Sequence, residues 1–87
     1  METRIGKVTH FYNHLSVAVL DLTGELKVGD RIHILGHSTD FEQQVNSLEI
    51  EHQKVQSVGP KAEVALKVAG VVRGGDQVYV VREDKAG

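Results

Sequence analysis

The sequence contains no cysteine and no tryptophan, a single proline, and only two tyrosines and two phenylalanines. Without cysteine, a disulfide framework, a thiolate metal site and a cysteine nucleophile are all excluded, and a reducing compartment fits the composition. No apolar run approaches the roughly 20 residues of a membrane-spanning helix, and the first residues show no signal-peptide pattern. We therefore expect a soluble, cytoplasmic protein with no membrane partner.

An excess of charge of one sign is also lacking. Ten Lys and Arg residues stand against twelve Asp and Glu residues, for a formal charge of −2, so the chain as a whole is not attracted to phosphate groups. Any contact with nucleic acid would have to be local. At this length the chain is expected to form one domain over residues 1–87, with a charged end, residues 83–87, that frays.

Glycine and valine are abundant, and they favour a β protein with tight turns over a helical bundle. A Gly-Asp pair followed by an alternating strand occurs twice. The two copies, 46 positions apart, are Gly29-Asp30-Arg31-Ile32-His33-Ile34 and Gly75-Asp76-Gln77-Val78-Tyr79-Val80. Glycine adopts positive φ without a Cβ clash, and an Asp carboxylate accepts hydrogen bonds from nearby backbone amides. The sequence therefore predicts equivalent turns at Gly29, Asp30, Gly75 and Asp76.

Alternating apolar residues predict further strands over residues 4–12, 15–20, 41–51 and 63–68. Asn13-His14 is predicted to form a tight hairpin turn, because both residue types tolerate left-handed backbone. The pattern does not decide which residues of the first strand face the core, since either Ile5 with Phe11 or Val8 with Tyr12 could point inward.

The apolar pattern of residues 41–51 changes parity near Asn46-Ser47, which a β-bulge in one long strand would explain. Residues 52–58 are weakly patterned and predicted as a connection, and Gly59-Pro60-Lys61 as a turn. These elements amount to six or seven strands and no helix. We expect an all-β fold, a small closed antiparallel β-barrel of Greek-key type, because closure removes the exposed edges of such a sheet.

Five histidines raise the question of a metal site. His10 and His14 flank the predicted hairpin, and His33 and His37 straddle a strand end, but no acidic residue stands at a diagnostic spacing. Solvated or hydrogen-bonding histidines are the better interpretation. No serine lies in a Gly-x-Ser-x-Gly elbow, and the glycine-rich residues 70–75 lack the Lys-Ser/Thr ending of a phosphate loop. We expect no enzyme activity, no cofactor and no metal.

An outward-facing set of basic, polar and aromatic side chains is the remaining candidate for function. Its members are Arg31, His33, Arg73, Gln77 and Tyr79. Proteins hold single-stranded RNA with aromatic side chains that stack on bases and a positive groove that follows the backbone. The same residues also fit an ordinary polar exterior, and both interpretations stay open.

A longer stretch around the first Gly-Asp turn resembles a known family. Residues 24–36, Gly-Glu-Leu-Lys-Val-Gly-Asp-Arg-Ile-His-Ile-Leu-Gly, resemble the signature of the β-barrel second domain of translational GTPases such as elongation factor Tu. Gly6-Lys7-Val8 is similar to that domain's opening, and residues 62–78 to its closing segment. Over residues 4–82 the chain also resembles small stand-alone proteins termed translation elongation factor-like, and the barrel appended to collagenase-like peptidases. With no phosphate loop and no GTPase domain, GTP binding by this chain is excluded.

The resemblance implies two functions. The favoured one is a non-enzymatic module that binds RNA, either tRNA or the ribosome, or a translation-related protein through its outer face. The alternative is a docking module for a separately encoded enzyme, such as a collagenase-like peptidase or a tRNA-modifying protein. A partner encoded elsewhere would then give the barrel its role.

Overall fold

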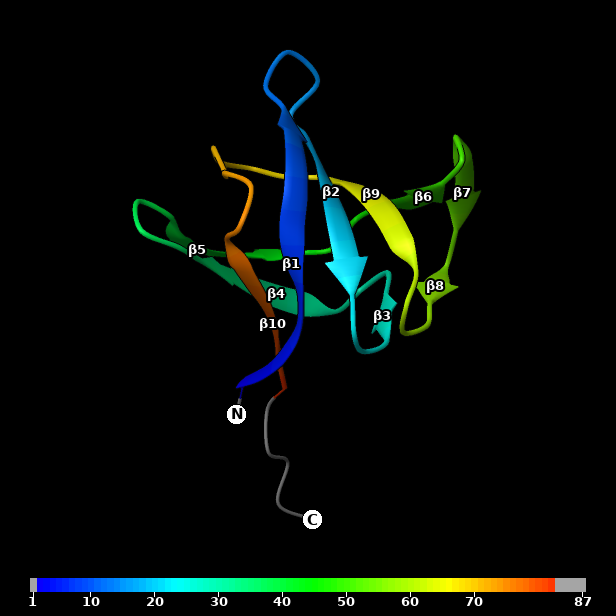
Figure 1. Ribbon diagram of the computed structural model, residues 1–87. Helices are drawn as coiled ribbons and strands as arrows, with labels where there is room; N and C mark the ends of the chain where they lie inside the picture. Colours follow the sequence, from blue (N-terminus) through cyan, green and yellow to red (C-terminus); the bar gives the residue numbers. More distant parts are fainter. Residues whose placement is uncertain (1, 83–87) are drawn as a thin grey trace.

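The computed structural model describes residues 2–82, which form ten β-strands with no helix among them (Figure 1). The strands are β1 (Glu2–Tyr12), β2 (Val17–Leu22), β3 (Leu26–Lys27), β4 (Arg31–Leu35), β5 (Asp40–Gln44), β6 (Leu48–Ile50), β7 (Gln53–Val55), β8 (Ser57–Val58), β9 (Glu63–Lys67) and β10 (Gln77–Val81). The predicted all-β class is confirmed, and this part of the chain contains no helix able to cross a membrane. Residues 83–87, predicted to fray, lie outside the described residues.

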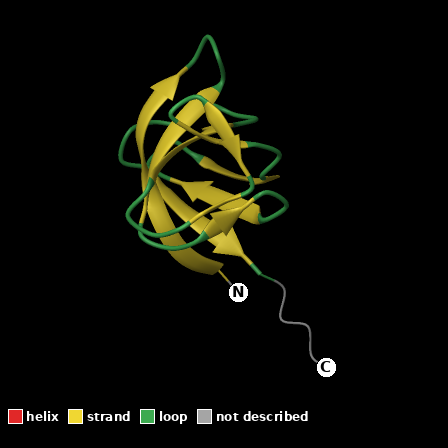
Figure 2. Cartoon of the chain, turned by 90° about the vertical axis from the view of Figure 1, so that its right-hand side faces the viewer, coloured by secondary structure: helices red, strands yellow, loops and turns green. Residues whose placement is uncertain are grey.

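Eight strands form one antiparallel sheet in the order β5-β4-β10-β1-β2-β9-β6-β7, and β3 pairs with β8 in a second, small sheet. The large sheet curls round on itself, as the two views at right angles show (Figures 1 and 2). Between its end strands, β5 and β7, the described residues form no ladder. The predicted closed barrel is therefore not confirmed, and the observed form is a curled, open sheet.

A side chain links the edge strand β5 to the end of β9. The Nε2 of Gln43 donates to the carbonyl oxygen of Lys67 at 2.9 Å, and its Oε1 accepts from the backbone N–H of Ala69 at 2.7 Å. A carboxamide can imitate a peptide group in this way, because it carries both donors and an acceptor. Gln43 thus supplies part of the hydrogen bonding that a strand ladder would supply in a closed barrel.

The two Gly-Asp turns have the same geometry. The N–H of Asp30 donates to the carbonyl oxygen of Lys27, and that of Asp76 to the carbonyl oxygen of Arg73, both at 3.1 Å. Each Asp carboxylate in turn accepts from the N–H of the residue three positions earlier, at 3.1 Å in the first turn and 2.9 Å in the second. Gly29 has a φ of 99° and Gly75 a φ of 97°, the region that glycine alone adopts without strain.

The surroundings of the two turns are equivalent as well. Val45 exchanges two backbone hydrogen bonds with the first turn, at 2.9 and 2.7 Å, and Val8 exchanges two with the second, at 2.7 and 2.8 Å. In the β4·β10 ladder His33 lies opposite Tyr79, the residue at the same place in the other repeat. A local two-fold axis through this pair therefore relates the two repeats.

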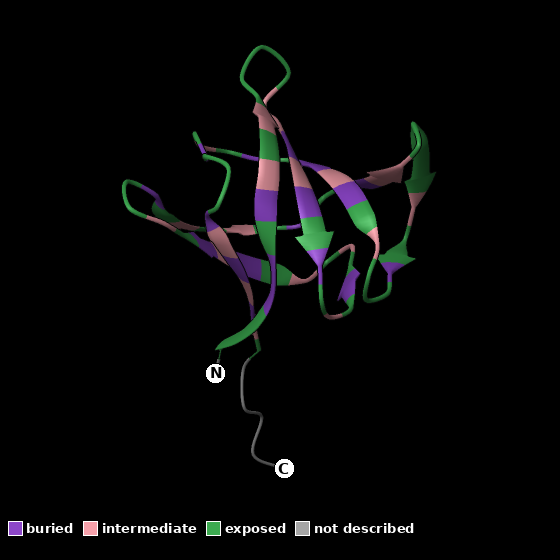
Figure 3. Ribbon diagram, in the orientation of Figure 1, coloured by how far each residue is buried: buried purple, intermediate pink, exposed green. Residues whose placement is uncertain are grey.

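Buried residues alternate with more exposed ones along the strands (Figure 3), and nearly all of the buried residues are apolar. Alternation along the strands sends every second residue inward. Ile32 and Ile34 of β4 are fully buried, and so are Ala18 and Leu20 of β2. The other members of the core are Ile5, Val8, Leu22, Leu26, Val45, Leu48, Val58, Val64, Leu66, Val68, Val72, Val78 and Val80.

Two irregularities in β1 resolve the question of its inner face. The register shifts between Arg4 and Gly6 against β10, and between Val8 and His10 against β2. Each shift moves the inward parity by one residue. As a result both Ile5 and Val8 are buried, and Phe11 packs against the core.

Gly6 is required where β1 and β2 approach closely. A Cβ atom at this position would lie 2.4 Å from the backbone oxygen of Asp21. A strand backbone cannot yield at that distance without separating the ladder.

The tight turn predicted at Asn13-His14 is present, but it is part of a longer loop, and neither residue takes left-handed backbone. The β1–β2 connection is a four-residue loop over residues 13–16, closed by a 3.1 Å hydrogen bond from the N–H of Leu15 to the carbonyl oxygen of Tyr12. Ser16 takes a left-handed φ of 54°, and its carbonyl oxygen accepts from the N–H of Val68 at 2.8 Å. This bond to the end of β9 favours the longer loop over a two-residue turn.

The predicted long strand over residues 41–51 is wrong, because the chain leaves one edge of the sheet and joins the other. Val45 follows β5 and bonds to the first Gly-Asp turn, and the chain then enters β6, which pairs with β9. The change of parity marks this crossover and not a bulge. Residues 52–58, predicted as a connection, contain the short strands β7 and β8.

Candidate functional site

Four neighbouring strands, β5, β4, β10 and β1, present a polar outer face. His33 at its centre lies opposite Tyr79 in one ladder and opposite Glu42 in the other, with the His33 and Tyr79 ring centroids 6.4 Å apart. The face, called the His33 face below, comprises Glu2, Arg31, His33, Asp40, Glu42, Gln77 and Tyr79. The structure thus brings four of the five predicted surface residues together.

His33 is held between two carboxylates. Its Nδ1 lies 2.9 Å from a carboxylate oxygen of Glu2, and its Nε2 lies 2.6 Å from a carboxylate oxygen of Asp40. Both contacts favour the imidazolium form, in which both ring nitrogens donate. The hydrogen bond to Asp40, followed by the one to Glu2, raises the pKa of His33 above its ordinary value of 6.5, and partial burial opposes this rise.

The remaining basic residues give the face no excess of positive charge. Arg31 pairs with Glu42 at 2.7 Å, and Arg4 donates to the side chain of Gln77. Acidic groups from β1 and β5 therefore neutralise the cations in the middle of the sheet. Arg73 belongs to the second Gly-Asp turn, and within the described residues its side chain makes no hydrogen bond or ion pair with the other predicted residues.

One group of residues in the described chain has a spacing that could hold a metal ion. Glu2, His33 and Glu42 each place one potential ligand atom within 4.8 Å of the others. Carboxylate oxygens and an imidazole nitrogen suit a divalent cation such as zinc. In this structure the same side chains form the ion pair with Arg31 and the His33 network, so we assign them a structural role.

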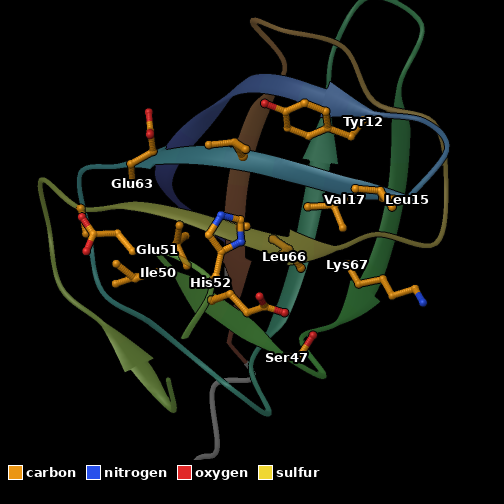
Figure 4. A pocket seen from close by; sticks show the side chains of 15 residues that line it. Tyr12, Leu15, Val17, Ser47, Ile50, Glu51, His52, Glu63, Leu66 and Lys67 are labelled. Carbon is orange, nitrogen blue, oxygen red and sulfur yellow. The ribbon is translucent and has the colours of Figure 1, made fainter. Parts of the chain in front are cut away.

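A second surface feature is an open groove of about 970 Å³ on the outer side of β2 and β9 (Figure 4). Val17 and Val19 of β2 lie beside Ala65 of β9 along it, with Val19 and Ala65 directly opposite in the ladder. The sides come from the β1–β2 loop and from the β6–β7 hairpin. The groove is called the Leu15 groove below and is defined by Tyr12, Leu15, Val17, Val19, Ile50 and Ala65.

The hollow exists because β6 leaves β9 after two paired residues. Leu48 pairs with Leu66 and Glu49 with Ala65, after which β6 continues into a hairpin with β7. The turn of this hairpin has positive φ at two successive residues, Glu51 and His52, as a two-residue turn of type I′ requires. The small side chain at position 65 leaves the space between the strands unfilled.

Apolar side chains at this groove are exposed to solvent. Leu15 is 64% exposed and Tyr12 is 50% exposed, and the other two exposed large apolar residues in the described chain, Leu35 and Val71, do not line the groove. The polar lining includes three carboxylates, Glu49, Glu51 and Glu63, against one ammonium group, that of Lys67. The groove is thus apolar with an acidic margin.

Sequence patterns did not reveal the Leu15 groove. Its exposed leucine, Leu15, was predicted as the first residue of a strand. The groove residues of the β6–β7 hairpin were predicted in one long strand over residues 41–51, apart from His52, which was predicted in a connection. A leucine at an exposed loop tip was the available signal, because such positions are ordinarily polar.

The described residues hold no pairing suited to nucleophilic catalysis. Among their histidines, His10 bonds to the carbonyl oxygen of Thr9 and His33 to the carboxylates of Glu2 and Asp40, and none bonds to a serine hydroxyl. An activated serine would require such a base within hydrogen-bond reach.

Known proteins resemble this chain in sequence and in fold. An uncharacterised protease from Methanocaldococcus jannaschii is 40% identical over 80 residues, which cover 91% of this chain and 20% of that protein. This chain therefore spans about a fifth of the length of the curated relative it matches. No protein-family model matches the chain.

Two crystal structures show the same arrangement of strands. Both are of the C-terminal domain of a "putative U32 peptidase" from Geobacillus thermoleovorans, with TM-scores of 0.85 and 0.83 and 16% identity. The alignments cover 90% and 87% of this chain, and 91% and 96% of that domain. This chain has the fold of that C-terminal domain.

The sequence was predicted to resemble two families, and these matches support only one of the two resemblances. The likeness to a domain appended to peptidases is supported by the structures and by the protease relative. The likeness to the second domain of translational GTPases, with the RNA binding it implies, has no support from them.

Proposed function

We propose that this chain is a non-catalytic docking module of a collagenase-like peptidase. It binds the catalytic part of such an enzyme and contributes no reacting group. One observation carries the proposal: nearly the whole chain matches a segment that makes up only a fifth of a protease. The other four fifths of that protein have no counterpart in this chain and provide the surface for docking.

Surface chemistry supports docking on a protein over binding of RNA. RNA-binding modules combine a positive groove with accessible aromatic rings, and their affinity falls with salt. On the His33 face the arginine is already paired with Glu42, and the imidazole is held by two carboxylates. Two of the four exposed large apolar side chains of the described residues, those of Tyr12 and Leu15, lie together at the Leu15 groove, and a contiguous exposed apolar patch is a usual sign of a protein contact.

The experiment uses the M. jannaschii relative after it has folded at full length. A recognition sequence for a site-specific protease is inserted at each junction of its matching segment, and the purified protein is cut there. We expect the excised segment to co-elute with the rest of the protein in size-exclusion chromatography at low micromolar concentration. Elution of the segment by itself would contradict the proposal. Salt-dependent binding of this chain to tRNA, abolished by Arg31→Ala with Arg73→Ala, would favour the RNA alternative.

A further inference from the structure

The Leu15 groove is an open, largely apolar hollow on the surface of the fold. Its six defining residues come from β1, the β1–β2 loop, β2, β6 and β9, so residues distant in sequence build it together. Figure 4 shows the side chains of Leu15, Val17 and Ile50 around it. We propose that the Leu15 groove receives an apolar segment, with a Lys or Arg residue at one end, from the catalytic part of a collagenase-like peptidase. This inference rests on the function proposed above and assigns it a surface.

The exposure of Leu15 has no explanation within the fold. The loop is closed by backbone groups, through the hydrogen bond from the N–H of Leu15 to the carbonyl oxygen of Tyr12 and through the bond between Val68 and Ser16. The leucine side chain contributes to neither bond. Burying a leucine side chain contributes about 1.5–3 kcal/mol relative to leaving it in water, so a partner that covers it gains affinity.

The dimensions of the groove suit a peptide segment. Its volume of about 970 Å³ lies at the upper end of the roughly 300–1,000 Å³ typical of ligand pockets, and it is partly open to solvent. Its floor of Val17, Val19 and Ala65 offers no side-chain hydrogen bond, so the occupant must present apolar groups there.

The charged residues around the groove indicate what charge the bound segment carries next to its apolar part. Glu51 and Glu63 are exposed at its margin, Glu49 is half-buried, and Lys67 is the one amine among its lining residues. Opposite charges across an interface steer association and select the partner. Glu63 and Lys67 lie at opposite ends of β9, and Figure 4 shows Glu51 on the side of Glu63. A basic residue at the corresponding end of the apolar segment therefore complements the acidic end of the groove.

The test is a displacement assay with the cut M. jannaschii protein. This chain is added in excess, and the release of the excised segment is followed by size-exclusion chromatography. Wild-type chain is expected to displace the segment. Leu15→Asp is expected to raise the concentration needed by at least about tenfold, because it places a charge on an apolar contact. Glu51→Lys with Glu63→Lys is expected to weaken displacement as well, with a smaller effect at high salt.

Val71→Asp is the matched control. Val71 is 68% exposed, close to the 64% of Leu15, but lies outside the groove. It receives the same new charge, and displacement by this variant is expected to equal that of the wild type. Circular dichroism verifies that both variants fold.

The outcomes separate the groove from the docking function. Equal displacement by Leu15→Asp and wild type, or equal loss in Leu15→Asp and Val71→Asp, would overturn the groove while leaving the docking function in place. Failure of the excised segment to co-elute would overturn both. A dimer of this chain that Leu15→Asp dissociates would identify a second copy as the occupant and would overturn the proposal.

Discussion

The two Gly-Asp turns allow a clean measurement of what positive φ contributes to this fold. In Gly75→Ala the new Cβ atom meets nothing within 4 Å, so the substitution introduces no clash. What it introduces is backbone strain, since the φ of 97° is a region that L-residues avoid. Such strain costs about 1–3 kcal/mol, and the lower entropy of the unfolded alanine chain offsets about 0.4–1 kcal/mol of it.

We therefore expect Gly75→Ala to lower the free energy of unfolding by about 1–2 kcal/mol. For a domain of this size this corresponds to a fall in Tm of about 4–16 °C, at roughly 4–8 °C for each kcal/mol. Gly29→Ala, with a φ of 99° and equally open space, should cost the same within error. Thermal and urea unfolding followed by far-UV circular dichroism give both values.

Gly59→Ala provides the control. Its Cβ also meets nothing within 4 Å, but its φ lies outside the positive region. We expect this variant to be as stable as the wild type or slightly more stable, because alanine restricts the unfolded chain. Equal stability of Gly59→Ala and Gly75→Ala would refute the reasoning, and a large difference between the Gly29 and Gly75 variants would refute the equivalence of the turns.

Three further predictions concern single contacts. The contacts of His33 with Asp40 and Glu2 stabilise the fold fully below the pKa of about 6.5 that His33 has in the unfolded chain, and this stabilisation is lost as pH rises through the higher pKa of His33 in the folded protein. Asp40→Asn should lower the pKa of His33 in the folded protein, as measured by NMR titration. Gly6→Ala should destabilise by about 1–3 kcal/mol or more in urea unfolding, because its Cβ would meet the backbone oxygen of Asp21. Gln43→Leu should cost about 1–3 kcal/mol for two hydrogen bonds and speed exchange of the Ala69 amide proton.

A specific result would contradict each of these three predictions. A His33 pKa that Asp40→Asn leaves unchanged would remove the assigned cause, and Arg31→Gln, which breaks only the neighbouring ion pair, serves as the comparison. Gly6→Ala with wild-type stability would mean that the strands separate without cost. Unchanged amide exchange in Gln43→Leu would show that other contacts hold β5 to β9.

Local chemistry made part of this fold predictable from the sequence. Alternation of aliphatic residues placed Ile32, Ile34 and Val64 inside, because a strand sends every second side chain to the same face. The repeated Gly-Asp pairs pointed to two turns of one kind, since few residues other than glycine accept positive φ and Asp readily bonds nearby amides. These features depend on neighbours within a few positions.

The remaining features depend on partners far along the chain. The change of parity after Val45 looks the same in sequence for a bulge and for a crossover, and only its bonds to the first Gly-Asp turn decide between them. Gln43 bridges to a backbone 24 positions away, which no local pattern encodes. The Leu15 groove needs the β1–β2 loop beside the β6–β7 hairpin, a neighbourhood that exists only in the folded sheet.

Calorimetric titration tests the docking function most directly. This chain is titrated at several temperatures into the M. jannaschii protein from which the matching segment has been cut and removed. The account predicts saturable one-to-one binding with a negative heat-capacity change, because apolar surface is buried on association. No heat beyond dilution, or binding with a heat-capacity change near zero, would contradict it.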